Sequence, residues 1–383
     1  MRRRVAFGSF ALLLLSAAVG LAQSEEGVFS AEGVQIHTDA RVHTLFATLN
    51  ERGYDRESER GPEPTLAARY HVLRHRLRDK LKLGVDVQKA ADSFIAAHPD
   101  NVIRYTRAVL ELGDAPQFDV PDGVSLGGYE AISKVLASAW AAGAGEVYDN
   151  DVADYRKVHK DLLPRVDALS ADLRKLLRME GTTDEQFAAE SDDSDRVIVI
   201  YNPLDSHGTQ LRHRSGKTRY VVLGPWKVVS DKGVLDPVVV EMTRALLAPE
   251  LARVASTPPS QALFQRAGAA AASYKTAQDY LSEALSRVVA RAALKRPLVL
   301  RTGAEHDAEL PAEADLARAF DAVFLKGTNK LADALPTLMA QAAQPGSAPA
   351  PEATPAPAAA AEPAGDPKKP AATPVKGKTP GKG

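Results

Sequence analysis

Apolar positions along the first half of the chain follow a helical period. From about 34 to 178, apolar residues recur every three to four positions, as they do on amphipathic helices. The short run Val34–His37 predicts a strand, and Asp39 is placed to cap the helix that follows it. Further helices are expected at 64–82, 86–97, 101–112, 127–142 and 150–178. Pro164 lies inside the last of these and predicts a kink or a boundary there.

The period changes after the polar segment 182–195. Val197–Tyr201 is a β-branched run that predicts a buried strand. Residues 220–223 and 226–229, separated by Gly224-Pro225, predict two more strands. Asp236-Pro237 then predicts an N-cap and a first helical turn, and helices are expected at 238–247, 267–294, 312–326 and 328–342. The predicted fold class is α+β and mostly helical, with one small sheet of about three to four strands beside the helix at 237.

Both ends of the chain differ from this body. Arg2, Arg3 and Arg4 precede an apolar run over 5–19 and small residues up to Ala22, which predicts a cleavable secretory signal at 1–22. We therefore expect a periplasmic or extracellular protein without a transmembrane segment after cleavage, since a span needs about 20 apolar residues. Residues 344–383 hold 10 of the 25 prolines and predict a disordered Ala/Pro/Lys-rich tail. Between the two ends we distinguish a helical N-terminal region at 23–181 from the sheet and helices at 182–343.

Composition narrows the expected partners. The formal net charge is −1 and both ends are basic, so the body is acidic, which argues against nucleic acid as a partner. The chain has no cysteine, so it forms no disulfide and carries no lipid-anchored cysteine. The expected partner is an unidentified protein or an anionic envelope polymer that the basic tail could touch.

Two short motifs favour ordinary structure over chemistry. Ser215-Gly216-Lys217-Thr218 resembles the end of a phosphate-binding loop, but Leu211 replaces the required glycine and a strand follows, so a hairpin turn is expected. His71 and His75 are spaced like metal ligands on a helix. Arginines surround both histidines, which predicts a solvated basic face.

A polar loop leaves one catalytic alternative open. His207 and His213 are expected in this loop, with Asp205 and Ser206 beside the first histidine. A serine–histidine–aspartate site would suit an active secreted hydrolase, although triad residues normally converge from separate elements. An ordinary surface loop is the default interpretation.

The segment 236–249 reads DPVVVEMTRALLAP and carries the most informative pattern. It resembles the metal helix of secreted bacterial gluzincin-like metallopeptidases, which reads His-Glu-x-x-His and continues to Asn-Pro. Glu241 matches the glutamate that activates the zinc-bound water, and Pro249 matches the proline. The resemblance implies that Val240 and Arg244 occupy the positions of the two zinc-binding histidines.

A downstream segment extends the resemblance. Residues 280–287 read YLSEALSR, and by similarity Glu283 matches the family's third zinc ligand and Arg287 its arginine, with Tyr280 as possible support. Segments 33–54, 201–204 and 223–225 also resemble the family, so the likeness spans residues 33 to 300.

The substitutions change the chemistry that the resemblance implies. A catalytic zinc needs three protein ligands; valine offers no lone pair, and a guanidinium repels a cation. We therefore expect no metal, no cofactor and no catalytic residue at this relict site, and a binding or scaffold role in the cell envelope or outside the cell. The alternatives are an active secreted hydrolase with an unrecognised site and a structural helical protein without an ancestral active site. If Arg244 replaces the zinc cation, its nitrogens should lie within about 4 Å of a Glu283 oxygen.

Overall fold

The computed structural model describes residues 29–31, 34–54, 77, 79–99, 102–179, 196–205, 210–225, 233–300 and 310–344. The chain divides into two units, residues 1–345 and 346–383, and the second unit lies wholly outside the described residues. The predicted signal at 1–22, the strand at 226–229, the tail after 344 and most of the helix at 64–82 also lie outside them, as do His71, His75, Ser206 and His207. No helix in the described ranges is long and apolar enough to cross a membrane.

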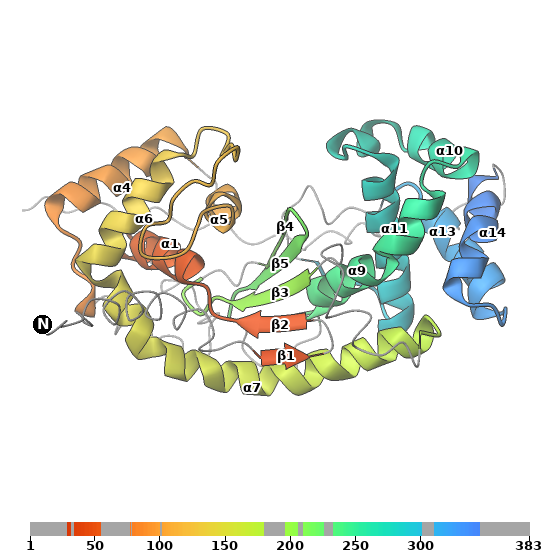
Figure 1. Cartoon of the computed structure of the whole chain (residues 1–383), viewed down its shortest axis with the longest axis horizontal. Helices are drawn as coiled ribbons and strands as arrows, with labels where there is room; N and C mark the ends of the chain where they lie inside the picture. The colour runs from red at the N-terminus through yellow and green to blue at the C-terminus, as the bar shows by residue number, and fades with distance from the viewer. Residues whose placement is uncertain are drawn as a thin grey trace, which may run out of the picture. The chain divides into compact units, whose positions relative to one another are not determined.

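One mixed sheet lies at the centre of the described fold (Figure 1). Its strands are β1 Phe29–Ala31, β2 Val34–His37, β3 Arg196–Tyr201, β4 Gln210–Ser215 and β5 Thr218–Leu223. Their order is β1-β2-β3-β5-β4; β2, β3 and β5 are parallel, whereas β1 and β4 pair antiparallel at the two edges. The predicted α+β class is confirmed, and the strand at Val34 joins the sheet as expected.

The two edge strands were not predicted. β4 forms a hairpin with β5 in which Ser215 pairs with Thr218 across Gly216 and Lys217. Gly216 has a φ of +56°, which glycine adopts without steric cost and which suits the first central position of a two-residue hairpin loop. The expected hairpin turn at 215–218 is therefore confirmed. The expected loop around His213 was wrong, because His213 lies on a strand.

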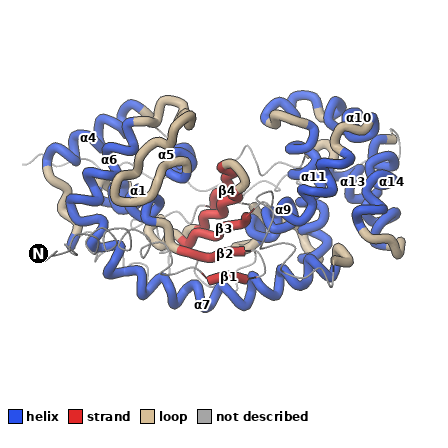
Figure 2. The backbone as a smooth tube through the Cα atoms, viewed as in Figure 1, coloured by secondary structure: helices blue, strands red, loops and turns tan. Residues whose placement is uncertain are grey.

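Helices make up most of the other residues that the structure describes (Figure 2). Before β3 they are α1 Ala40–Glu51, α4 Val85–Ala97, α5 Val102–Leu110, α6 Ala131–Ala139, a π-helical turn Trp140–Ala144 and α7 Gly145–Leu176. After β5 they are α9 Asp236–Val254, α10 Pro258–Arg266, a 3-10 turn Gly268–Ser273, α11 Ala277–Leu294, α13 Glu313–Ala319, a π-helical turn Phe320–Leu325 and α14 Leu331–Ala343.

Several predicted boundaries shift for identifiable reasons. Pro164 and Pro249 lie inside continuous helices, α7 and α9, so neither proline ends its helix. The single helix predicted over 267–294 is interrupted, because Thr276 caps a new helix by accepting a hydrogen bond from the Asp279 N–H at 3.1 Å. Asp236 is the first residue of α9 and not its N-cap. Its carboxylate accepts from Arg296 Nη1 and from the Val299 N–H, each at 2.7 Å.

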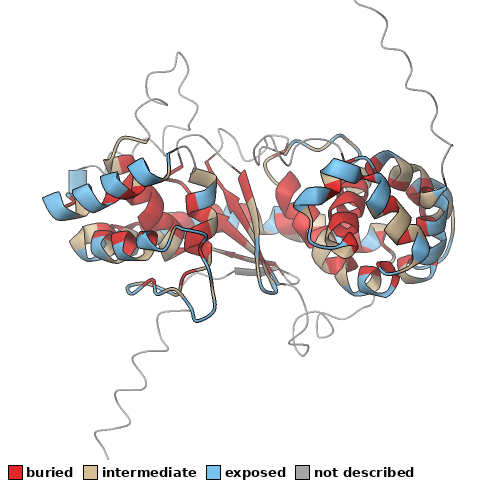
Figure 3. Ribbon diagram, turned by 90° about the horizontal axis from the view of Figure 1, so that it is seen from above, coloured by how far each residue is buried: buried red, intermediate tan, exposed pale blue. Residues whose placement is uncertain are grey.

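The sheet separates two apolar cores (Figure 3). Side chains alternate between its faces: Val199 and Val221 belong to the core shared with α7, α9, α11, α13 and α14. Ile200 and Val222 belong to the core shared with α1, α4, α5 and α6. The same alternation on β4 directs its polar residues to opposite faces, and this arrangement builds the site.

Candidate functional site

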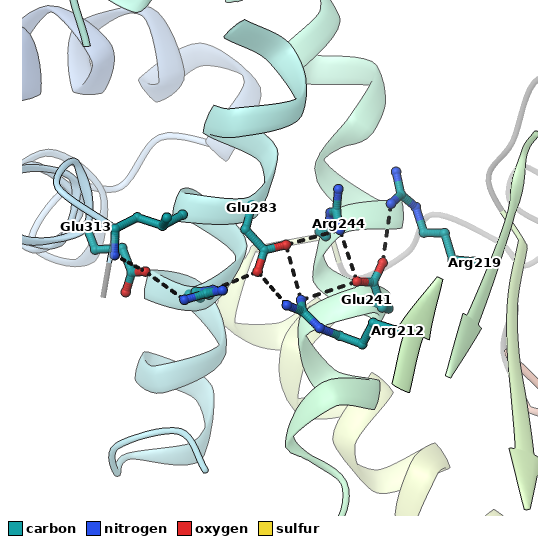
Figure 4. Close-up of polar contacts among 8 residues, drawn as sticks. Arg212, Arg219, Glu241, Arg244, Glu283 and Glu313 are labelled. Carbon is teal, nitrogen blue, oxygen red and sulfur yellow. Dashed lines mark hydrogen bonds and ion pairs between the residues drawn. The ribbon is translucent and has the colours of Figure 1, made fainter. Parts of the chain in front are cut away.

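Helices α9 and α11 pack against each other and bring two carboxylates together (Figure 4). Glu241 comes from α9 and Glu283 from α11, and each side chain is only 3% exposed. Buried carboxylates are rare unless cations or hydrogen-bond donors pair with them. The arginines around these two glutamates therefore define the site.

Arg244 lies between the two carboxylates. Its Nη1 is 3.0 Å from Glu241 Oε1 and 3.1 Å from Glu283 Oε2. The predicted contact between Arg244 and Glu283 is therefore confirmed. A surface pair that involves only Glu241 is excluded, because Arg244 bridges two helices.

A second arginine, Arg212 on β4, holds the same two carboxylates. Arg212 Nη2 donates to Glu283 Oε1 at 2.8 Å, and Nη1 donates to Glu283 Oε2 at 3.1 Å. This is the bidentate geometry that a planar guanidinium makes with a carboxylate. Arg212 Nη1 also lies 3.3 Å from Glu241 Oε1. The sheet edge and both helices are thus tied together at one point.

These contacts occupy the acceptor positions of Glu283. Its Oε1 accepts from Arg212 and from Arg287 Nε, the latter at 2.7 Å, and its Oε2 accepts from Arg212 and lies 3.1 Å from Arg244 Nη1. An ionised carboxylate offers about four lone-pair sites, and four nitrogen contacts use them. Glu283 in this state has no lone pair left for a metal ion.

The network continues along α11 to α13. Arg287 Nη1 lies 3.3 Å from Glu313 Oε1, and Arg291 Nη2 pairs with Glu313 Oε2. Glu313 also accepts from the Leu310 N–H at 2.9 Å. Tyr280 takes no part in this network: its hydroxyl accepts from the Ala312 N–H at 3.1 Å, so it fixes the start of α13.

Arg219 on β5 completes the set by donating from Nη1 to Glu241 Oε2 at 3.3 Å. Arg212, Arg219 and Glu313 were not predicted from the sequence, because their contacts depend on tertiary packing. A signal was present, however. Alternate positions 212, 214 and 219 flank the hairpin turn, and on a two-stranded hairpin they share one face.

Electrostatics keeps the buried charges ionised. Burial raises the pKa of Glu241, but the guanidiniums of Arg244, Arg212 and Arg219 outweigh it and hold that pKa below its usual value. The pKa of Glu283 is also lowered: Arg212, Arg244 and Arg287 together outweigh the effect of burial. A carboxylate with a depressed pKa is a poor general base near neutral pH. By this measure Glu241 is poorly suited to act as a general base.

Val240 lies in the apolar core and is fully buried. Across the ranges that the structure describes, no group of three or more histidine, aspartate and glutamate side chains is placed to hold a metal ion. Of the two positions that the resemblance assigns to histidines, Val240 contributes to the core, and only Arg244 contacts the carboxylates.

The opposite face of β4 carries a separate polar group. His213 Nε2 lies 2.6 Å from Glu111 Oε1, and Ser215 Oγ donates to Glu111 Oε2 at 2.6 Å. In a catalytic triad the serine contacts the histidine and the carboxylate lies behind it. Here the carboxylate lies between the other two residues, so this arrangement does not activate Ser215.

No protein-family model, no curated protein and no solved structure matches the chain.

Proposed function

We propose that the chain is an exported, catalytically inactive relative of the gluzincin-like metallopeptidases that acts as a binding or scaffold protein. The observation that carries this proposal is the position of Arg244, whose Nη1 lies 3.0 Å from Glu241 Oε1 and 3.1 Å from Glu283 Oε2. These are the two carboxylates that the resemblance assigns to the base and to the third ligand, and Arg244 stands at the second histidine position. A guanidinium here supplies the positive charge that zinc would otherwise supply.

The substitution has a physical rationale. Two carboxylates facing each other in a buried site repel, so without a cation one of them would be protonated or the helices would separate. Arg244 and Arg212 remove that repulsion and keep α9 packed on α11. The site is thereby converted from a reactive centre into a structural one, which leaves binding or scaffolding as the proposed role of the protein.

Zinc content tests the inactive site directly. The mature chain, from residue 23 onward, would be dialysed against a zinc-containing buffer, then against zinc-free buffer, and analysed by elemental mass spectrometry. We expect no retained zinc, because only one of three ligands remains. About one tightly held zinc per chain, lost on Glu283→Gln, would contradict the proposal.

Restoration gives a complementary test of ancestry. A variant with Val240→His and Arg244→His, together with Arg212→Ala to free the carboxylates, should bind zinc if the old geometry persists. The same variant with Glu283→Gln is the matched control and should bind at least about tenfold more weakly, the usual scale for losing a ligand or its support. Equal zinc binding by both variants would show that Glu283 is not a ligand.

Export is tested separately. Residues 1–22 would be fused to a phosphatase reporter that is active only outside the cytoplasm, with Arg2, Arg3 and Arg4 changed to glutamate in the control. We expect activity from the native fusion and little from the control, since the basic segment and the apolar run together form the signal.

A further inference from the structure

Arg244 uses only part of its hydrogen-bonding capacity. A guanidinium carries five N–H groups, yet both carboxylate contacts of Arg244 are made through the single atom Nη1. Its Nε is buried and has no hydrogen-bond partner, and no acceptor for Nη2 is found among the described residues. The Nε–Nη2 edge, which is one of the two guanidinium edges that can bind a carboxylate in a bidentate manner, is therefore unused.

Arg212 shows the same shortage. Its side chain is 8% exposed, and its Nε is also buried without an acceptor. An unsatisfied buried donor is costly, and native proteins contain few of them. Two of them at the same cluster mean that no acceptor is placed to reach these Nε atoms, and Glu283 has none left to offer.

The missing acceptor should be anionic. Four guanidiniums, those of Arg212, Arg219, Arg244 and Arg287, surround Glu241 and Glu283 at this point, and Arg287 also contacts Glu313. Their combined field favours negative charge, and a low local dielectric strengthens that preference. A neutral amide or hydroxyl would accept a hydrogen bond from a donor but would gain little from the positive electrostatic potential of the cluster.

Access to the cluster is through Arg244. Its side chain is 15% exposed, whereas those of Arg219 and Arg287 are 2% and 3% exposed. Because Nε itself is covered, a ligand would first contact the exposed part of the Arg244 side chain. A narrow end group fits this access better than a bulky one.

We propose that the Arg244 edge of the cluster binds a carboxylate, in the form of a free peptide C-terminus. A planar carboxylate matches the Nε–Nη2 edge with two parallel hydrogen bonds, and a chain end is narrow enough to approach a mostly buried guanidinium. This inference rests on the proposed function, since it names the ligand class that the inactive site would bind.

The test compares two small probes on the whole mature protein by isothermal titration calorimetry. N-acetyl-trialanine has a free carboxylate and no other charge, and its C-terminal amide is the matched control. We expect saturable binding of the acid and at least about tenfold weaker binding of the amide. Acetate as a third probe separates a free acid from a peptide end: it should compete with the acid peptide but bind more weakly.

Two variants locate the site. Arg244→Gln should weaken binding of the acid peptide at least about tenfold. Arg253→Gln is the control on the same helix, because Arg253 is 71% exposed and contacts only Glu250 in the described structure, and it should bind like the native protein. If Arg244→Gln does not fold, the acid–amide comparison in the native protein still decides.

Absence of saturable binding, equal binding of acid and amide, or full binding by a folded Arg244→Gln protein would each overturn the inference. None of these results bears on zinc content. A zinc-free protein that does not bind the carboxylate probes would therefore refute this inference alone, whereas retained zinc would refute the proposed function.

Discussion

Arg244 connects two helices through one nitrogen atom, and its removal would leave two buried carboxylates facing each other. Arg212 would still hold both glutamates, but the acceptor position that Arg244 occupies on Glu283 would become empty. Breaking a buried charge pair on one side usually costs about 3–5 kcal/mol, because the remaining charge stays buried. The change in stability on mutating Arg244 therefore measures the burial of the carboxylates as much as their attraction to Arg244.

We accordingly expect Arg244→Ala to lower the free energy of unfolding by about 3–5 kcal/mol in urea denaturation. Arg253→Ala, which removes an exposed pair with Glu250 on the same helix, should change it by less than about 0.5 kcal/mol. Similar small losses for both variants would mean that Arg244 behaves as a surface residue.

His43 on α1 makes the free energy of unfolding depend on pH. Burial lowers its pKa to about 3, while the unfolded chain titrates near 6.5. Below pH 6.5 the unfolded state therefore binds one more proton than the folded state at this residue, and stability falls as pH falls. Between pH 6 and pH 4 the expected contribution is about 1.4 kcal/mol of unfolding free energy per pH unit.

The His43→Gln variant should lose this part of the change in unfolding free energy with pH. Its side-chain oxygen can still accept from the Tyr155 hydroxyl, which lies 3.2 Å from His43 Nδ1 in the native protein. Urea titrations at several pH values would measure both slopes. Parallel curves for the two proteins would show that His43 is not buried as a neutral imidazole.

At the scale of elements, α7, α9 and α14 each contain an interior proline that local rules would exclude. Pro164 in α7 and Pro249 in α9 are both exposed, and a proline inside a helix costs about 3 kcal/mol relative to alanine. The packing of each helix on both sides of its proline, as in the core contacts of Leu162, Val166 and Leu251, offsets that cost.

Replacing either Pro164 or Pro249 with alanine should stabilise the fold. We expect a gain of about 1–2 kcal/mol, which is the helical cost reduced by the larger entropy of the unfolded chain. Pro258 occupies the first turn of α10, where proline is tolerated, so Pro258→Ala should bring no gain. Thermal unfolding of the three variants compares them, and a loss of stability for Pro164→Ala and Pro249→Ala would contradict the expectation.

The sequence predicted those features of the site that lie along single helices. Glu241 and Arg244 are three residues apart on α9, and Glu283 and Arg287 are four apart on α11, so helical spacing alone places each pair together. β4 was missed because Gln210–Ser215 contains no β-branched residue and is bounded on one side by polar residues. Its strand character comes from pairing with β5, which no local propensity encodes.

At the scale of the whole molecule, one ionic network joins elements from β4 to α13. Arg212, Glu283, Arg287 and Glu313 form its continuous path, and Glu241 and Arg219 extend it to β5. Every described contact in this path lies within residues 212–313.

Truncation after residue 345 should therefore leave stability unchanged. A tail rich in alanine, proline and lysine has too little apolar surface to offset the entropy of ordering, and we expect the same unfolding midpoint and the same far-UV circular dichroism per helical residue. Limited proteolysis should cut beyond 345 before it cuts the body. A drop in midpoint of several degrees would show that the tail docks on the body.

The alternation of β4 has a consequence for how the chain reaches this fold. Arg212 faces Glu241 and Glu283 on one side of the sheet, while His213 and Ser215 face Glu111 on the other. A slip of one residue would move every side chain of the strand to the opposite face of the sheet. His213 would then lie next to the arginines of the cluster, and Arg212 would lose its contacts with both carboxylates. A hairpin in the wrong register would thus lose stabilising contacts on both faces of the sheet. The two-residue loop at Gly216 and Lys217 fixes the register in which Ser215 pairs with Thr218, and this register satisfies the polar contacts on both faces of β4.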